Sequence, residues 1–148
     1  MSKTHNLIAL ASLLTLAVYY PPATLNIATV CVCFIGNVVG SLMPDMDQAA
    51  NDLWDMLPAG NLIGKILRTI LVGHRTISHS IVGTLLTYKI LLVLTPKILN
   101  SSYINTSLVI ASVMIGVISH ILADSLTKEG IPLFFPITIK IGIPSARI

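Results

Sequence analysis

The sequence predicts an all-α integral membrane protein, a four-helix transmembrane bundle with a short interfacial amphipathic helix, in one domain over residues 1–148. Three observations carry this prediction. Of the 148 residues, 54% are hydrophobic and only 10% are charged, and the mean hydropathy is +0.86, far from the composition of a soluble domain. No charged side chain lies between His5 and Asp45. A soluble helix would show polar residues on its wet face at every turn or so.

The four predicted spans follow the apolar runs 7–20, 23–43, 77–94 and 103–123. Pro21 and Pro22 separate the first two, because proline cannot continue a helix interior. The last three runs approach the roughly 20 residues that cross a bilayer. The first is short, so tilting, local thinning of the bilayer or a re-entrant path stays open. A cleaved signal peptide is disfavoured because the exit at Tyr19–Pro22 lacks a small-x-small cleavage pattern.

The segments outside the spans are expected to lie at a surface. Apolar residues recur at helical spacing over Asn61–Val72, with Lys65 and Arg68 elsewhere on the wheel. This pattern predicts an amphipathic helix that either lies in the membrane interface or caps the bundle. We expect Trp54 to anchor at headgroup depth. The proline-broken tail over residues 130–136 is expected to fold back over the site or to dip into the interface.

The basic residues indicate the orientation. Four spans place the N-terminus, the loop over residues 44–76 and the C-terminus on one side, with seven of the nine basic residues: Lys3, Lys65, Arg68, Arg75, Lys128, Lys140 and Arg147. The positive-inside rule puts that side in the cytoplasm. The net charge of +3 therefore reflects topology, and the expected partner is membrane lipid rather than nucleic acid. The oligomeric state stays open.

Most groups able to do chemistry fall at that same end of the bundle. The start of the first span, the end of the second, the start of the third and the end of the fourth bring together His5, Asp45, Asp47, His74, His79, His120 and Asp124. Two nearby carboxylates repel unless a cation neutralises them, and imidazole and carboxylate groups suit divalent metals. His120 and Asp124 share a helix face at i and i+4, which fits a metal site or a plain hydrogen bond. The sequence therefore predicts a metal site at the membrane surface.

Arg75 stands between His74 and His79. A guanidinium is no metal ligand, but it can clamp a phosphate with two donors. Pairing with one of the aspartates is the alternative.

The motifs also resemble a known family. Pro-Asp-x-Asp at Pro44–Asp47, His-Arg-x-x-Ser-His-Ser at His74–Ser80, His-x-x-x-Asp at His120–Asp124 and the tail at Gly130–Pro136 closely resemble the YdjM-like membrane-bound metal-dependent hydrolases. That family is distantly similar to zinc-dependent phospholipases C and single-strand nucleases. The resemblance implies a helical metallohydrolase in which the seven histidines and aspartates above are ligands or catalysts. Gln48 stands where the family often has a histidine, so the number of metal ions stays open.

The predicted function is hydrolysis at the cytoplasmic face of the inner membrane. One or two divalent ions, zinc by ligand preference, would activate a water molecule. Asp45 or Asp47 would act as general base, and Arg75 would hold the anionic group of a phosphoester, either a small molecule or a lipid headgroup. The alternatives are a metal or ion transporter and a structural or regulatory scaffold with a structural metal site.

Overall fold

The computed structural model describes residues 2–48, 54, 60–70 and 76–143. Within these residues the chain forms five α-helices and one short 3₁₀ helix, η1. In chain order they are α1 (Ser2–Tyr19), α2 (Ile27–Leu42), η1 (Pro44–Asp47), α4 (Gly60–Ile70), α5 (Ile81–Ile98) and α6 (Thr106–Ser125). The predicted all-α class is therefore confirmed.

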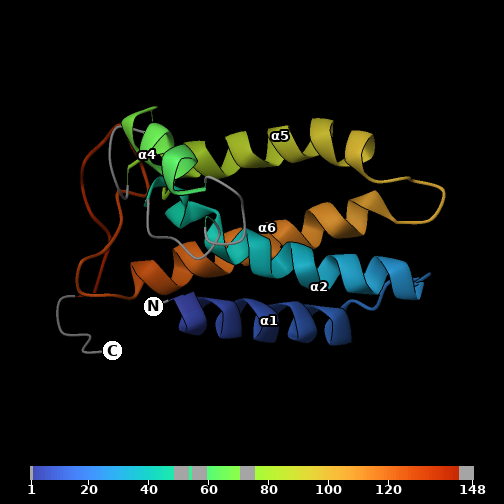
Figure 1. The fold of residues 1–148 in the computed structure, drawn as a ribbon. Helices are drawn as coiled ribbons and strands as arrows, with labels where there is room; N and C mark the ends of the chain where they lie inside the picture. The colour runs from blue at the N-terminus through green and yellow to red at the C-terminus, as the bar shows by residue number, and fades with distance from the viewer. Residues whose placement is uncertain (1, 49–53, 55–59, 71–75, 144–148) are drawn as a thin grey trace.

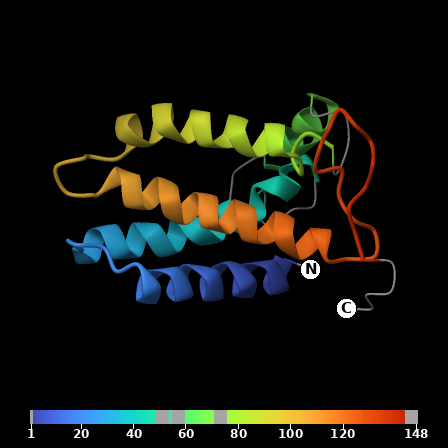
Figure 2. The ribbon, with the colours of Figure 1, turned by 180° about the vertical axis from the view of Figure 1, so that it is seen from behind.

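The four long helices lie side by side and alternate in direction (Figures 1 and 2). Helices α2 and α6 make the most extensive contact, α1 packs on both of them, and α5 packs on α6. The start of α1, the end of α2, the start of α5 and the end of α6 therefore meet at one end of the molecule, together with η1, α4 and the C-terminal segment (Figure 1). This end is called the site end below.

Side-chain caps fix where three of the long helices begin. Asn26, Ser80 and Asn105 are the N-cap residues of α2, α5 and α6, and each accepts a hydrogen bond from a backbone N–H three residues further on. Such a bond satisfies one of the donors that a helix leaves unpaired in its first turn. These helices consequently begin three to four residues later than the apolar runs at 23, 77 and 103. By contrast, α1 begins at Ser2, so His5 lies inside the helix rather than before it.

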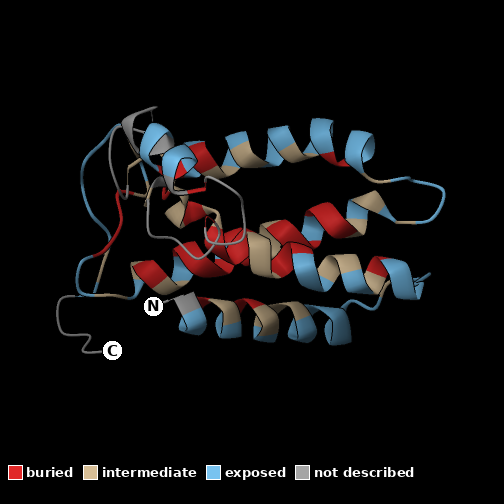
Figure 3. Ribbon diagram, viewed as in Figure 1, coloured by how far each residue is buried: buried red, intermediate tan, exposed pale blue. Residues whose placement is uncertain are grey.

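The core is the seam between α2 and α6, where the buried residues concentrate (Figure 3). Two glycines permit this close approach. A Cβ atom at Gly40 would collide with the backbone carbonyl of Val113, and one at Gly116 would collide with that of Asn37. The Gly-x-x-x-Gly pair at residues 36 and 40 thus serves a contact within the chain, as small residues do in packed membrane helices.

Helix α4 confirms the predicted amphipathic segment within its described range. It packs against η1. Its glycine face is buried at Gly60 and Gly64, whereas Leu62, Ile63 and Ile66 are exposed.

The expected interfacial role of Trp54 is wrong. Its side chain is only 6% exposed, and the indole N–H donates to the carbonyl oxygen of Met46 at 3.0 Å. Because Gly60 has no side chain, its backbone can lie directly against that of Trp54. The tryptophan consequently packs inside the protein beside η1.

The C-terminal segment folds back across the site end, which is one of the two placements predicted for it. Ile131 is fully buried in a cluster with Val117 and Ile121 of α6. Its backbone pairs with Ile141 in both directions at 2.9 Å, and the carbonyl of Leu133 accepts from the N–H of Ile81 at the start of α5. The segment therefore ties α5 and α6 together beside the site.

Candidate metal centre

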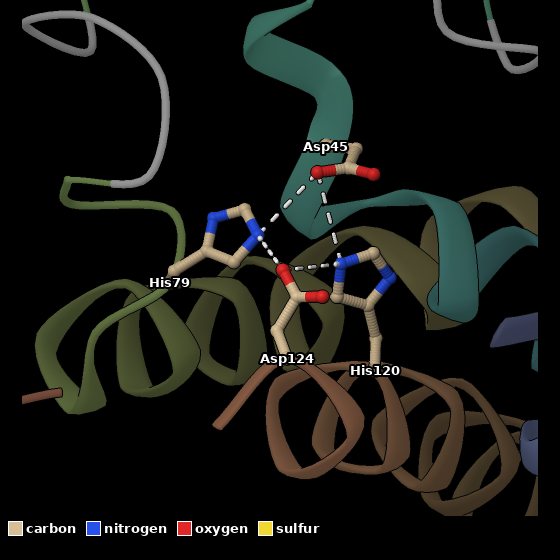
Figure 4. A group of neighbouring side chains, drawn as sticks. All are labelled: Asp45, His79, His120 and Asp124. Carbon is tan, nitrogen blue, oxygen red and sulfur yellow. Dashed lines mark ion pairs between the residues drawn. The ribbon is translucent and has the colours of Figure 1, made fainter. Parts of the chain in front are cut away.

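Four side chains from three elements converge at the site end (Figure 4). Asp45 comes from η1, His79 from the turn before α5, and His120 and Asp124 from the last turns of α6. One ligand atom from each of the four lies within 4.8 Å of every other, and the group could hold a metal ion. His79, His120 and Asp124 are buried, whereas the Asp45 side chain keeps 21% of its surface exposed. The site therefore opens toward solvent on the side of Asp45.

Local structure sets these four positions. Pro44 opens η1 at the end of α2, which turns the chain so that Asp45 faces α6. The hydroxyl of Ser80 accepts from the N–H of Gly83 at 3.1 Å and donates to the carbonyl of Ile77 at 2.7 Å. This cap leaves His79 in a turn, directed at the cluster rather than along a helix face. His120 and Asp124 lie one helical turn apart and share the buried face of α6.

The distances within the group are those of side chains around a small central volume. The Nε2 atom of His79 lies 3.3 Å from Asp124 Oδ2 and 3.4 Å from Asp45 Oδ1. The Nε2 atom of His120 lies 3.8 Å and 3.7 Å from the same two oxygens. Two nitrogens and two oxygens thus face one another, a donor set that suits zinc and related divalent ions.

The hydrogen bonds of His120 show that its Nε2 faces this centre as an acceptor. Its Nδ1 lies 2.6 Å from the carbonyl oxygen of Ser41, so Nδ1 carries the hydrogen and donates it. In the neutral ring Nε2 then holds a lone pair. Among the described residues, neither this Nε2 nor Asp45 Oδ1 has a hydrogen-bond partner, although both atoms are buried. A buried lone pair beside a buried carboxylate oxygen calls for a cation, and a backbone carbonyl on the other ring nitrogen is the usual support for a metal-binding histidine. The residues present therefore fit a divalent metal.

The charges of the group are coupled. Burial by itself would raise the pKa of Asp45, but the interactions of its carboxylate with the neighbouring rings of His79 and His120 outweigh it and hold the pKa below its ordinary value. Burial likewise disfavours charged His79, yet the neighbouring carboxylates of Asp124 and Asp45 raise the pKa of His79 above its ordinary value. The two carboxylates thus favour a proton on His79 in the metal-free protein, and a divalent cation bound between the same groups would take the place of that proton.

His5 reaches the group from α1. Its Nε2 lies 3.1 Å from Asp124 Oδ1, and its ring stacks on that of His120 with centroids 4.1 Å apart. The next residue, Asn6, accepts a hydrogen bond from the hydroxyl of Ser41. All four long helices or their ends therefore contribute to the site end.

Comparison with known proteins identifies the family of this sequence. The family described as "YdjM inner membrane protein" matches residues 1–148. The chain belongs to the YdjM inner membrane protein family. A relative in Bacillus subtilis (strain 168), "Uncharacterized protein YvsG", is 30% identical over 142 residues, which are 96% of this chain and 77% of that protein. No solved structure shows significant similarity to the chain.

Membership of the YdjM family agrees with the apolar character of the helices. Helices α5 and α6 are long and apolar enough to cross a membrane, and α2 is a shorter apolar helix of 16 residues. The predicted family resemblance is thereby confirmed, as is the presence of membrane-length apolar helices.

The structure brings together five of the seven predicted ligands of this YdjM protein: His5, Asp45, His79, His120 and Asp124. His74, Arg75 and the side chain of Asp47 lie outside the described residues, and their roles stay predictions, as does the binding of metal by the other five. The convergence of helix ends at one end of the bundle is as the sequence predicts.

Three supporting residues went unrecognised in the sequence. Ser41 holds His120 through its carbonyl, Asn6 holds Ser41, and the hydroxyl of Ser78 lies 3.0 Å from Nδ1 of His79. Ser41 and Asn6 are polar residues at the site-end termini of otherwise apolar helices. That position is a signal that could have marked them.

Proposed function

We propose that this YdjM family protein is a membrane-bound, metal-dependent hydrolase that acts on a phosphoester, in a small molecule or a lipid headgroup, at the cytoplasmic face of the inner membrane. The observation that carries the proposal is the buried group of two histidines and two aspartates, in which His120 Nε2 and Asp45 Oδ1 have no hydrogen-bond partner among the described residues. Asp45, His79, His120 and Asp124 would hold the ion, zinc by preference, with a second ion left open.

A bound divalent ion would supply Lewis acidity and an activated water at neutral pH. The chain supplies the rest. Asp45 is the one member of the group with a partly exposed side chain, so substrate would enter beside it, and Asp45 would accept the proton released on attack, with Asp47 as the nearby alternative. Burial of the other three side chains excludes competing water from the inner part of the site. Arg75, four residues before His79, would hold the anionic phosphoryl group with its two-donor fork.

The membrane arrangement belongs to the same proposal. The four long helices would form the transmembrane bundle, with α4 in the interface and its exposed Leu62, Ile63 and Ile66 toward the acyl chains. Lys65, Lys128 and Lys140 belong to the chain around the site end, whereas Lys97 belongs to the last turn of α5 at the other end. The positive-inside rule then puts the site end and both termini in the cytoplasm.

Metal content provides the first test. Zinc-supplemented protein should retain about one to two equivalents after removal of free metal, and His120→Ala should lower both the metal content and the melting temperature, because it removes a donor from the centre of the group. Ser125→Ala, near the end of the same helix and outside the group, is the matched control. Wild-type protein that keeps full stability in chelator and carries no metal would contradict the proposal.

Turnover provides the second test. In the zinc-loaded protein, Asp45→Asn should lower phosphate or headgroup release from phospholipid in mixed micelles by about 100-fold, equivalent to about 2.7 kcal/mol of transition-state stabilisation. Arg75→Lys should lower it by about tenfold with unchanged metal content, because the lysine keeps the charge and loses the fork. Glu129→Gln, an exposed carboxylate outside the group, should change neither quantity.

A structural metal site is the second candidate. Four protein donors from three elements form the closed type of site that holds folds together, and here they join the ends of α2, α5 and α6. Metal-dependent stability without turnover of any phosphoester, soluble or lipid, would favour this function over hydrolysis.

A further inference from the structure

The first turns of α1 contact the side chains of the candidate metal centre directly. His5 is buried although Lys3 and Thr4 beside it are exposed. It touches both candidate ligands of α6, through a hydrogen bond to Asp124 and a ring stack on His120.

The two oxygens of the Asp124 carboxylate have different neighbours. Oδ1 lies 3.1 Å from Nε2 of His5, whereas Oδ2 lies 3.3 Å from Nε2 of His79 and 3.8 Å from Nε2 of His120. One oxygen is thus held from the α1 side and the other faces the centre of the group. His5 is not one of the four residues whose ligand atoms all lie within 4.8 Å of one another, and its Nε2 lies within hydrogen-bond distance of Oδ1 instead.

The contacts that His5 and Asn6 provide also orient the ring of His120. The His5 ring lies nearly parallel to the His120 ring, with an interplanar angle of 26°. Asn6 accepts from the hydroxyl of Ser41, and the carbonyl of Ser41 in turn accepts from Nδ1 of His120. Two consecutive residues of α1 therefore fix the ring plane and the hydrogen-bond acceptor of His120.

We infer that His5 is a positioning residue of the metal centre rather than one of its ligands: it holds Asp124 so that a single oxygen faces the ion, and it fixes the ring of His120. The inference rests on the metal site of the proposed function but not on hydrolysis. It differs from the ligand role that the sequence predicts for His5. Groups that orient metal ligands in this way typically change metal affinity by about 10- to 100-fold when they are removed.

Two variants separate the alternatives. His5→Gln keeps an N–H donor near the position of Nε2, whereas His5→Phe keeps an aromatic ring against His120 and removes the donor. Thr4→Ala, at an exposed neighbouring position, is the control. Zinc affinity would be measured by competition with a chromophoric chelator, and the number of imidazoles on zinc by X-ray absorption spectroscopy of the full-length protein.

We expect two imidazoles on zinc, His79 and His120, in wild type, His5→Gln and His5→Phe alike. Affinity should fall about tenfold or more in His5→Phe and return close to the wild-type value in His5→Gln. Three imidazoles in wild type, reduced to two in both variants, would overturn the inference and make His5 a ligand. Zinc binding with two imidazoles but without turnover would refute the hydrolase and leave the positioning role intact.

Thermal unfolding of the metal-free protein tests the hydrogen bond from His5 to Asp124 separately from zinc binding. His5→Phe leaves a buried oxygen of Asp124 without this donor, so it should melt at a lower temperature than His5→Gln. Equal melting temperatures for the two variants would overturn the inference.

Discussion

Helices α5 and α6 look alike in the sequence and are used in different ways. Both are long and apolar enough to cross a membrane, yet half of the most apolar stretch of α6 is buried within the protein and only 11% of that of α5. The buried face of α6 carries four of its polar residues, Ser112, Ser119, His120 and Asp124, whereas only Gly83 and Thr95 are buried in α5. Large apolar residues of α5, among them Leu85, Leu86 and Val93, are exposed, and exposed positions predominate along the α5 ribbon in Figure 3.

The difference shows that length and hydropathy identify a helix that could cross a membrane but do not predict how much of its surface is buried within the protein. In a bilayer the exterior is as apolar as the interior, so helix association depends on close packing and on interhelical hydrogen bonds. Helix α6 has both, through Gly116 against α2 and through the bond from His120 to Ser41. Helix α5 also contacts α6, but most of its surface is exposed.

The largest effect expected from this difference is at Gly116. A valine there would drive its Cβ into the backbone of α2, which cannot move without separating the two helices, so Gly116→Val should cost about 3 kcal/mol or more. Ala111→Val, on an exposed position of the same helix, should change stability little. Denaturant unfolding of the two variants in detergent would measure both. Equal stability would mean that α2 and α6 do not pack as described.

Truncating an apolar side chain should also cost more stability in α6 than in α5, but the expected difference is smaller than at Gly116. Ile121→Ala in α6 empties a site that is 6% exposed and packs against Ile131, so it should cost about 2 kcal/mol or more. Leu86→Ala in α5, at 52% exposure, should cost less than about 0.5 kcal/mol. A large effect of Leu86→Ala in the monomer would show that α5 packs in solution against a surface absent from this arrangement.

The smallest expected effect concerns pH and arises only at the end of α6 that carries the site. In the metal-free protein the pKa of His79 is raised, so the folded state binds this proton more tightly than the unfolded state. Protonation therefore stabilises the fold fully at a pH below the ordinary histidine pKa, and this contribution is lost as the pH rises through the raised pKa. Zinc requires deprotonated His79, so its affinity rises over the same range. The difference in melting temperature between zinc-loaded and chelated protein should therefore widen with increasing pH, by an amount equivalent to about 1.4 kcal/mol for each tenfold gain in affinity.

A matched variant sharpens that measurement. His79→Gln removes the titrating group, so the difference between zinc-loaded and chelated protein should become small and nearly independent of pH. A difference in melting temperature that narrows with increasing pH in the wild type would contradict the raised pKa of His79.

Much of this fold follows from sequence patterns. The apolar runs locate all four long helices to within about four to five residues, an error usual for helix ends, and alternating direction then brings the correct ends together. The remaining error has a physical cause at particular residues. The caps at Asn26, Ser80 and Asn105 delay three helices, and the polar first turn at Ser2–Asn6 extends α1 beyond its apolar run.

The candidate site divides in the same manner. Spacing alone places His120 and Asp124 on one face of α6, and the topology adds Asp45, His79 and His5. The hydrogen-bond acceptor of the His120 ring could not be predicted, because the carbonyl of Ser41 is a backbone group and has no side-chain signature. Burial of Trp54 also escaped prediction, since an aromatic residue in a loop beside an amphipathic helix is equally typical of an interfacial anchor and of a packed residue.

The bond between His5 and Asp124 joins residues that are 119 positions apart in the chain, and this separation bears on biogenesis. Asp45 and His79 are synthesised well before Asp124, and they lack their partners His120 and Asp124 until α6 has been made and has packed against α1 and α2. Before α6 is made, the nascent chain therefore carries only Asp45 and His79 of the four residues that could hold a metal ion. Binding of the proposed metal would be among the last events in making this protein, and a ribosome-stalled chain lacking α6 would hold the three earlier long helices without the ionisable side chains that α6 supplies to the site.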